Sequence, residues 1–89
     1  MGEPLVIEVQ ATPNPNAAKF MLNRVVATQG TTYRAVASAE TEWAKQLLGI
    51  AGVTQVFALN NFISVNKAPE ADWNAIGPQI EQVLRHAFA

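Results

Sequence analysis

Residues 12–20 read Thr12-Pro13-Asn14-Pro15-Asn16-Ala17-Ala18-Lys19-Phe20. The two prolines fix their own φ angles and push the residues before them, Thr12 and Asn14, away from the helical region. This stretch therefore cannot lie inside a helix. Ordinary β-hairpin loops use Asn-Gly or Asp-Gly, which accept positive φ at little cost, so the sequence predicts an unusual and rigid connection between two strands.

The residues on either side of this stretch alternate between two faces, as they do in half-buried strands. The alternation covers residues 5–10 before the prolines and residues 18–23 after them. A period of two is typical of a strand with one buried face, so we expect an antiparallel pair. Residues 24–37 are ambiguous, because residues 28–32 are typical of a turn whereas residues 33–36 are compatible with a short edge strand.

A short amphipathic helix is predicted next. Ser38 is a candidate N-cap, and Glu40 and Glu42 fall in the first turn, where negative charge favours the helix dipole. An apolar stripe follows and ends at Gly49, a candidate residue for the position just after the helix. The stripe consists of Trp43, Ala44, Leu47 and Leu48.

The second half of the chain repeats the order of two strands and a helix. Residues 53–59 and 62–66 are rich in β-branched and aromatic residues, and Asn60-Asn61 between them suits a tight turn. Asp72 can cap a second amphipathic helix, which Gly77-Pro78 is expected to interrupt, leaving a regular helix over residues 78–87. The stripe of this helix consists of Trp73, Ile76, Ile80, Leu84 and Phe88.

The element order defines a fold class. Strand, strand, helix, strand, strand, helix (ββαββα) is most simply satisfied by a two-layer α/β (α+β) sandwich with a largely antiparallel sheet. Both amphipathic helices then cover one face of the sheet. With 89 residues and 49% hydrophobic composition, we expect residues 1–89 to form a single globular domain.

Composition argues against several classes of function. Six Lys and Arg against seven Asp and Glu give a net charge of −1, and the basic residues are dispersed, which disfavours nucleic-acid binding. The chain has no cysteine, which removes disulfides and thiolate ligands and fits a reducing compartment. No apolar run approaches the ~20 residues that span a bilayer, so we expect a soluble cytoplasmic protein without a membrane partner.

Side chains suited to catalysis are scarce. Ser38 and Ser64 are the only serines, His86 is the only histidine, and no motif brings them together. No glycine-rich phosphate loop is present, so we do not expect an enzyme. Trp43 and Trp73 fall on apolar helical stripes and are expected in the core, the alternative being that one is an exposed interface anchor. Lys67, at a strand end, is expected to be solvated.

Three blocks of sequence, in order, resemble the N-terminal domain of the Nfu/NifU-like iron–sulfur scaffold proteins. The resemblance covers roughly residues 5–85. The first block is residues 11–16 with Lys19-Phe20, the second includes residues 44–53, Val56-Phe57 and 62–67, and the third is Asp72-Trp73 with Pro78 and Ile80.

The resemblance implies the fold described above and a process, the assembly or transfer of iron–sulfur clusters. In full-length family members a Cys-x-x-Cys pair in a separate C-terminal domain holds the cluster, and thiolates are the ligands that a cluster needs. Because this chain has no cysteine, the expectation is a non-enzymatic accessory module. Its partners would be iron–sulfur assembly or acceptor proteins, and a cluster would be bound only through such a partner.

The residues that identify the family also form the candidate interaction loop. Two roles are open for this loop. Its asparagine side chains satisfy local backbone groups and nothing more, or the rigid loop presents a preorganised surface to a partner. Two alternatives to docking also remain open: direct iron or metal binding through carboxylates and His86, and a purely structural oligomerising domain. The candidate loop residues are Thr12, Pro13, Asn14, Pro15, Asn16, Lys19 and Phe20.

Overall fold

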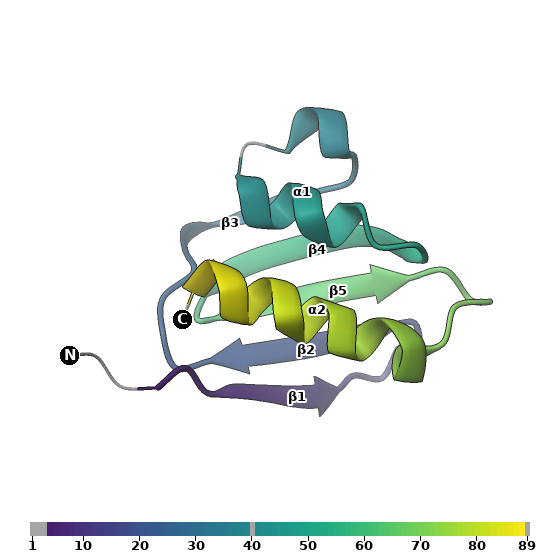
Figure 1. Cartoon of the computed structure of the whole chain (residues 1–89), viewed down its shortest axis with the longest axis horizontal. Helices are drawn as coiled ribbons and strands as arrows, with labels where there is room; N and C mark the ends of the chain where they lie inside the picture. Colours follow the sequence, from purple (N-terminus) through teal and green to yellow (C-terminus); the bar gives the residue numbers. More distant parts are fainter. Residues whose placement is uncertain (1–3, 40, 89) are drawn as a thin grey trace.

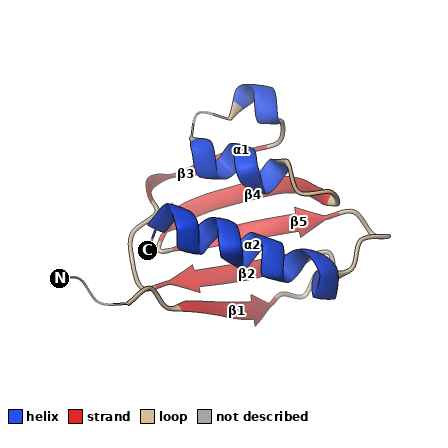
Figure 2. Ribbon diagram, in the orientation of Figure 1, coloured by secondary structure: helices blue, strands red, loops and turns tan. Residues whose placement is uncertain are grey.

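The computed structural model describes residues 4–39 and 41–88 and has two layers, a five-stranded sheet and two helices (Figures 1 and 2). The elements in chain order are β1 (Ile7–Ala11), β2 (Ala17–Leu22), β3 (Ala27–Tyr33), a 3-10 turn (Val36–Ser38), α1 (Glu42–Leu48), β4 (Val53–Asn60), β5 (Phe62–Lys67) and α2 (Trp73–Phe88).

The sheet has the order β1-β2-β5-β4-β3, and every neighbouring pair is antiparallel. Both helices lie on the same face of the sheet (Figure 1), so the predicted two-layer α+β class is confirmed. Figure 1 shows α2 crossing in front of β5 and β2, with β1 at the lower margin. The edge strand β1 is therefore covered less than the centre of the sheet.

The strand β3 was not predicted. The sequence indicated a turn over residues 28–32 and an edge strand over residues 33–36, whereas the strand is Ala27–Tyr33 and a 3-10 turn follows it. Gly30 weakens the strand signal, but the ring of Phe57 on β4 lies across it, 3.2 Å from where a Cβ would stand. An aromatic side chain packed over an edge glycine supplies the contacts that the glycine lacks.

The connection between β4 and β5 is the predicted tight turn. Asn60 has a φ of 52°, in the left-handed region that asparagine tolerates, and Leu59 pairs directly with Phe62. The turn also bonds to the rest of the sheet, because the Asn61 side chain donates to the carbonyl of Leu22 at 3.1 Å.

The helix α1 ends at Gly49 as expected but begins differently from the expectation. Thr41, not Ser38, is the N-cap, and its hydroxyl accepts from the backbone N–H of Ala44; Glu40 lies outside the described residues. Gly49 keeps a right-handed φ of −77°. The left-handed glycine is Gly52, three residues later, with a φ of +100°, so the chain reverses there before it enters β4.

The helix α2 starts where predicted but runs without interruption. The Asp72 carboxylate accepts from the backbone N–H of Asn74 at 3.0 Å, as an N-cap does. Pro78 lies inside the continuous helix. A proline ring clashes with the Cβ of the preceding residue when that residue is helical. The residue before Pro78 is Gly77, which has no Cβ, so this part of the cost of a proline inside a helix is absent.

The core lies between the sheet and the helices. Its most deeply buried large side chains are Phe20, Leu47, Val56, Ile63, Val65, Ile80 and Leu84. The two tryptophans pack against this core but stay partly exposed. Trp43 meets Tyr33 edge-on and also contacts Phe88. No helix in residues 4–39 and 41–88 is long and apolar enough to cross a membrane.

The two glycines after α1 make a matched test of this geometry. We expect Gly52→Ala to lower the free energy of unfolding by about 1–3 kcal/mol, because it forces an L residue to positive φ and places a Cβ 2.7 Å from that of Ala71. Gly49→Ala, at ordinary helical φ, should change it by less than about 0.5 kcal/mol. Urea unfolding measures both, and equal losses would contradict the assigned turn.

Candidate functional site

The connection between β1 and β2, residues 12–16, is here called the Pro-Asn loop. Its polar side chains hold its own backbone. Thr12 Oγ1 accepts from the N–H of Asn14, and its hydroxyl lies 2.8 Å from the Asn14 carbonyl and 2.9 Å from that of Ala17. The Asn14 side chain accepts from the N–H of Asn16 at 2.9 Å. These local bonds match the proposed role of the asparagines in satisfying backbone groups.

The Pro-Asn loop is also bound by two residues far away in sequence. The indole N–H of Trp73 donates to the carbonyl of Pro15 at 2.9 Å. The amine of Lys67 donates to the side-chain oxygen of Asn16 at 3.0 Å and to the carbonyl of Ala68 at 3.3 Å, and the backbone N–H of Lys67 donates to the Asn16 carbonyl at 2.8 Å. The loop is thus fixed to the end of β5 and the start of α2.

The expectation that Lys67 is solvated is wrong, since only 8% of it is exposed. Alternation along β5 carried the missing signal. Ile63 and Val65 face the core, so Lys67 in the same register faces the helices rather than solvent. Its amine also lies 5.7 Å from the centre of the Trp73 ring, a favourable position for a cation. One hydrogen-bond partner of its amine, Asn16, is 51 residues away in sequence, and the other, Ala68, is the next residue.

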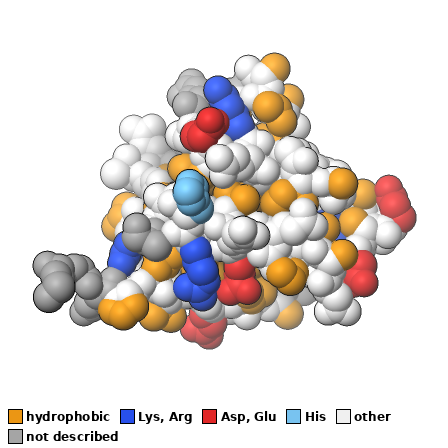
Figure 3. All heavy atoms as spheres, viewed as in Figure 1, with side chains coloured by type: hydrophobic (Ala, Val, Ile, Leu, Met, Phe, Trp, Pro, Cys, Tyr) orange, Lys and Arg blue, Asp and Glu red, His pale blue; other side chains and the backbone are white. Residues whose placement is uncertain are grey.

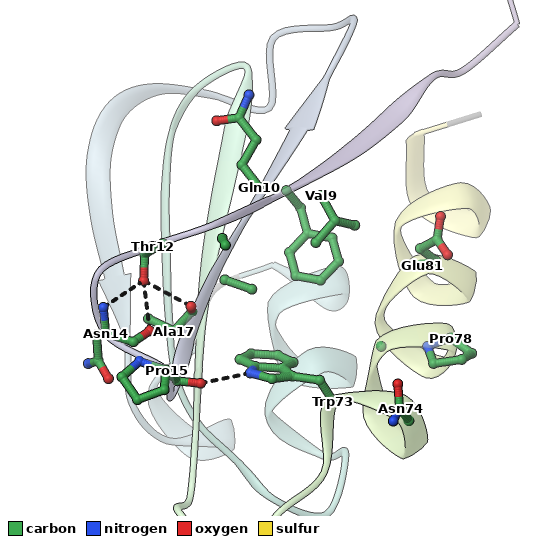
Figure 4. A pocket seen from close by; sticks show the side chains of 14 residues that line it. Val9, Gln10, Thr12, Asn14, Pro15, Ala17, Trp73, Asn74, Pro78 and Glu81 are labelled. Atoms are coloured by element: carbon green, nitrogen blue, oxygen red, sulfur yellow. Dashed lines mark hydrogen bonds between the residues drawn. The ribbon is translucent and has the colours of Figure 1, made fainter.

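An open groove of about 570 Å³ runs beside the Pro-Asn loop, between β1 and α2 (Figure 4). Phe20 of β2 and Trp73 of α2 contribute apolar surface to it, with Val9 on one side and Pro78 on the other. In Figure 4 the side chain of Val9 points toward α2, whereas that of Gln10 points away. The groove therefore exists because α2 leaves the outer part of the sheet face open.

The groove has open space at Gly77 and little charge. Gly77 lines the groove, and a Cβ built there would meet no atom within 4 Å, so the space above this residue is empty. Of the described residues that line the groove, Glu81 alone carries a charge. In Figure 3 hydrophobic side chains reach the surface along the lower margin, with acidic side chains beside them. The groove is mostly apolar with one acidic side chain along it, a composition typical of ligand and partner sites.

The structure separates the seven candidate residues. Four of them, Thr12, Asn14, Pro15 and Phe20, line the groove, and Phe20 does so as a core residue that is 1% exposed. Pro13 and Asn16 are not among the lining residues. Lys19 lies on the opposite face of the sheet, where its amine is 4.3 Å from the centre of the Phe62 ring. The lysine beside the loop is therefore Lys67.

The donor groups present do not fit an iron–sulfur cluster. The sequence contains no cysteine, and within residues 4–39 and 41–88 no three His, Asp or Glu side chains gather into a metal-binding group. His86 is exposed near the end of α2 and lines a hollow with Gln46, Gln79 and Gln82. That hollow offers amides and one imidazole, which is a poor set for a hard or a thiophilic metal.

The chain is a small α+β domain in which the Pro-Asn loop borders an apolar groove. Comparison with protein families then gives the family. The model described as "Scaffold protein Nfu/NifU N terminal" matches residues 7–89, so the chain belongs to that family.

Relatives with curated descriptions are larger proteins. The chain is 35% identical over 83 residues to "Conserved virulence factor C" of Staphylococcus aureus, a match that covers 92% of this chain and 22% of that protein. It is 29% identical over 82 residues to the protein of the same description in Staphylococcus haemolyticus, again over 22% of its length. The chain therefore spans about a fifth of the length of these relatives.

Solved structures include chains of similar size. The crystal structure of protein SAV1430 from Staphylococcus aureus superposes with a TM-score of 0.79 at 30% sequence identity, covering 88% of this chain and 96% of that one. The solution structure of SeR13 from Staphylococcus epidermidis gives a TM-score of 0.63 at 33% identity, covering 90% and 94%. These likenesses confirm the α+β fold.

The bonds from Lys67 predict a specific loss. Lys67→Met keeps the aliphatic stem but removes the amine, so it leaves the Asn16 side-chain oxygen without its partner and should cost about 1–3 kcal/mol of unfolding free energy. Lys45→Met, on an exposed helical surface, should change stability by less than about 0.5 kcal/mol.

Hydrogen exchange distinguishes a local effect from a global one. The backbone N–H of Ala17, the residue after the Pro-Asn loop, donates to the carbonyl of Asn14 in the loop. The backbone N–H of Leu22, at the other end of β2, donates to the carbonyl of Asn61. In Lys67→Met, exchange at Ala17 should accelerate more than at Leu22. Equal acceleration, or none at Ala17, would show that Lys67 does not hold the loop.

Proposed function

We propose that this chain is a non-enzymatic docking module in iron–sulfur cluster assembly, acting in the cytoplasm, that binds proteins carrying the cluster ligands. One observation carries the proposal: a domain of the Nfu/NifU N-terminal family that has no cysteine but has an apolar groove beside a fixed loop. The cluster is cargo of the partner in this proposal, and the chain contributes recognition.

Preorganisation supports the groove as the docking surface. A loop that is already ordered loses little conformational entropy when a partner binds. The Pro-Asn loop is held at Pro15 by Trp73 and at Asn16 by Lys67 before any partner arrives. The sides of the groove are also fixed, because Phe20 belongs to the sheet and Trp73 to the start of α2.

Titration of the isotope-labelled chain with a Cys-x-x-Cys Nfu-type domain, with and without its cluster, tests the proposal. We expect NMR shifts at groove residues such as Thr12, Trp73 and Gly77, and none at the hollow that contains His86. The surface opposite the helices serves as a further internal control. A titration that leaves every amide unchanged contradicts docking on this class of partner.

Calorimetry with ferrous iron tests the competing reading. The proposal predicts no binding heat at micromolar iron, because the described carboxylates and His86 do not converge. Heat with micromolar affinity, reduced in His86→Ala, would favour direct iron binding instead. The same chain with the Lys45→Met substitution is the matched control, since it changes an exposed side chain that is not among the residues lining the hollow.

A further inference from the structure

The edge strand β1 exposes backbone groups in a register that can be deduced. The C=O of Val6 accepts from the backbone N–H of Asn23, the residue after β2, and the N–H of Val6 donates to the Asn23 side-chain oxygen. Along an antiparallel strand such groups alternate between the two sides. Glu8 and Gln10 therefore bond to β2, whereas the N–H and C=O groups of Ile7, Val9 and Ala11 point outward from the sheet.

Two of these residues, Val9 and Ala11, also line the groove. Val9 pairs with Phe20 and Ala11 with Ala18, both buried on the helix side of the sheet. The side chain of Val9 is nevertheless 53% exposed. Residues that offer free backbone groups at the edge thus also place apolar side chains along the open side of the groove.

The edge at β1 has little of the usual protection against strand pairing. Natural edge strands are blunted by proline, by charged side chains, lysine above all, or by a bulge, and of these β1 has one charged residue, Glu8. The sequence of β1 is Ile-Glu-Val-Gln-Ala, and its pairing with β2 has no register shift. The other edge strand, β3, is irregular, with a register shift between Ala27 and Thr31. An unprotected edge beside an apolar groove is the arrangement that receives an added strand.

Charge indicates which kind of strand fits. Glu8 lies on the face opposite the groove, its cross-strand neighbour is Met21, and no ion pair of Glu8 is found among the described residues. Glu81 lines the groove itself, and its partner Arg85 lies 3.7 Å away at an exposed position. Glu81 is thus already paired, and Lys19, on the same face as Glu8, has its amine 4.3 Å from the Phe62 ring. The carboxylate of Glu8 therefore stays without an ion pair among the described residues, which favours a partner segment carrying a cation.

We propose that β1 receives an extended, basic segment of a partner protein as a sixth strand, antiparallel to β1 like every other neighbouring pair in the sheet. Side chains opposite Ile7, Val9 and Ala11 are apolar, those opposite Val9 and Ala11 enter the groove, and a Lys or Arg opposite Glu8 faces its carboxylate. Backbone bonds to β1 supply affinity, and the alternation of apolar and basic side chains supplies specificity. This inference rests on the proposed docking function and names its mode and the chemistry of the partner.

The probe is a short capped peptide of alternating valine and lysine, made in two forms with the same composition. In the first form the backbone nitrogens of the lysine residues are N-methylated, so the backbone N–H groups of the valine residues can still bond to β1. In the second form the backbone nitrogens of the valine residues are N-methylated, which removes those bonds. We expect the first form to bind and the second to bind at least about tenfold more weakly, since two or more hydrogen bonds are lost. NMR shifts should centre on Ile7, Val9 and Ala11.

Variants of the chain test the same geometry. Val9→Pro deletes an outward N–H without removing a bond to β2, and edge strands tolerate proline; it should weaken the peptide about tenfold or more. Asn74→Phe should obstruct the groove. Ala75→Phe, exposed on the same turn but outside the groove lining, is its control and should bind normally. Thermal unfolding confirms that each variant folds.

Each alternative outcome overturns the inference. It fails if both peptide forms bind equally, if neither binds below about 1 mM, or if the shifts map to Phe57 and Phe62 on the opposite sheet face. It also fails if sedimentation shows self-association that Val9→Pro abolishes, since β1 then receives a second copy of the chain. If the Cys-x-x-Cys domain docks while the peptide does not, the docking function stands and only this mode is lost.

Discussion

The buried amine of Lys67 determines how the end of the molecule that carries the Pro-Asn loop is built. Burying a lysine amine is costly unless hydrogen-bond acceptors surround it, and two oxygens do so here, the side-chain oxygen of Asn16 and the carbonyl of Ala68. This requirement couples the end of β5 to the Pro-Asn loop. Trp73 completes the coupling through the carbonyl of Pro15. The loop, the start of α2 and the groove between them therefore form one connected unit.

Most of the fold follows from local sequence, because each correctly predicted element has a clear period and clear boundaries. The Asp72 cap and the Asn60-Asn61 turn were both predicted and observed. At β3, where prediction failed, contacts between distant residues decided the outcome. The strand β3 exists because β4 pairs with it and Phe57 packs over Gly30. No window of residues 24–37 contains that information.

The site was predictable only in part, and for the same reason. The Pro-Asn loop is conspicuous in the sequence, and its rigidity follows from two prolines. The groove is not, because it depends on how far α2 extends over β1, and that distance is a tertiary property. Lys67 lay within reach of prediction, since alternation with Ile63 and Val65 places it on the buried face. Its assignment as a solvated residue rested on its position at the end of the strand.

The central claim is that the free chain already holds its Pro-Asn loop, and therefore its groove, in one conformation. Backbone nitrogen relaxation of the free chain measures this most directly. The structure predicts order parameters of about 0.85 for the amides of Asn14, Asn16 and Ala17, equal to those of the central strand β5. Values below about 0.6 at these residues, with β5 unchanged, would contradict the claim.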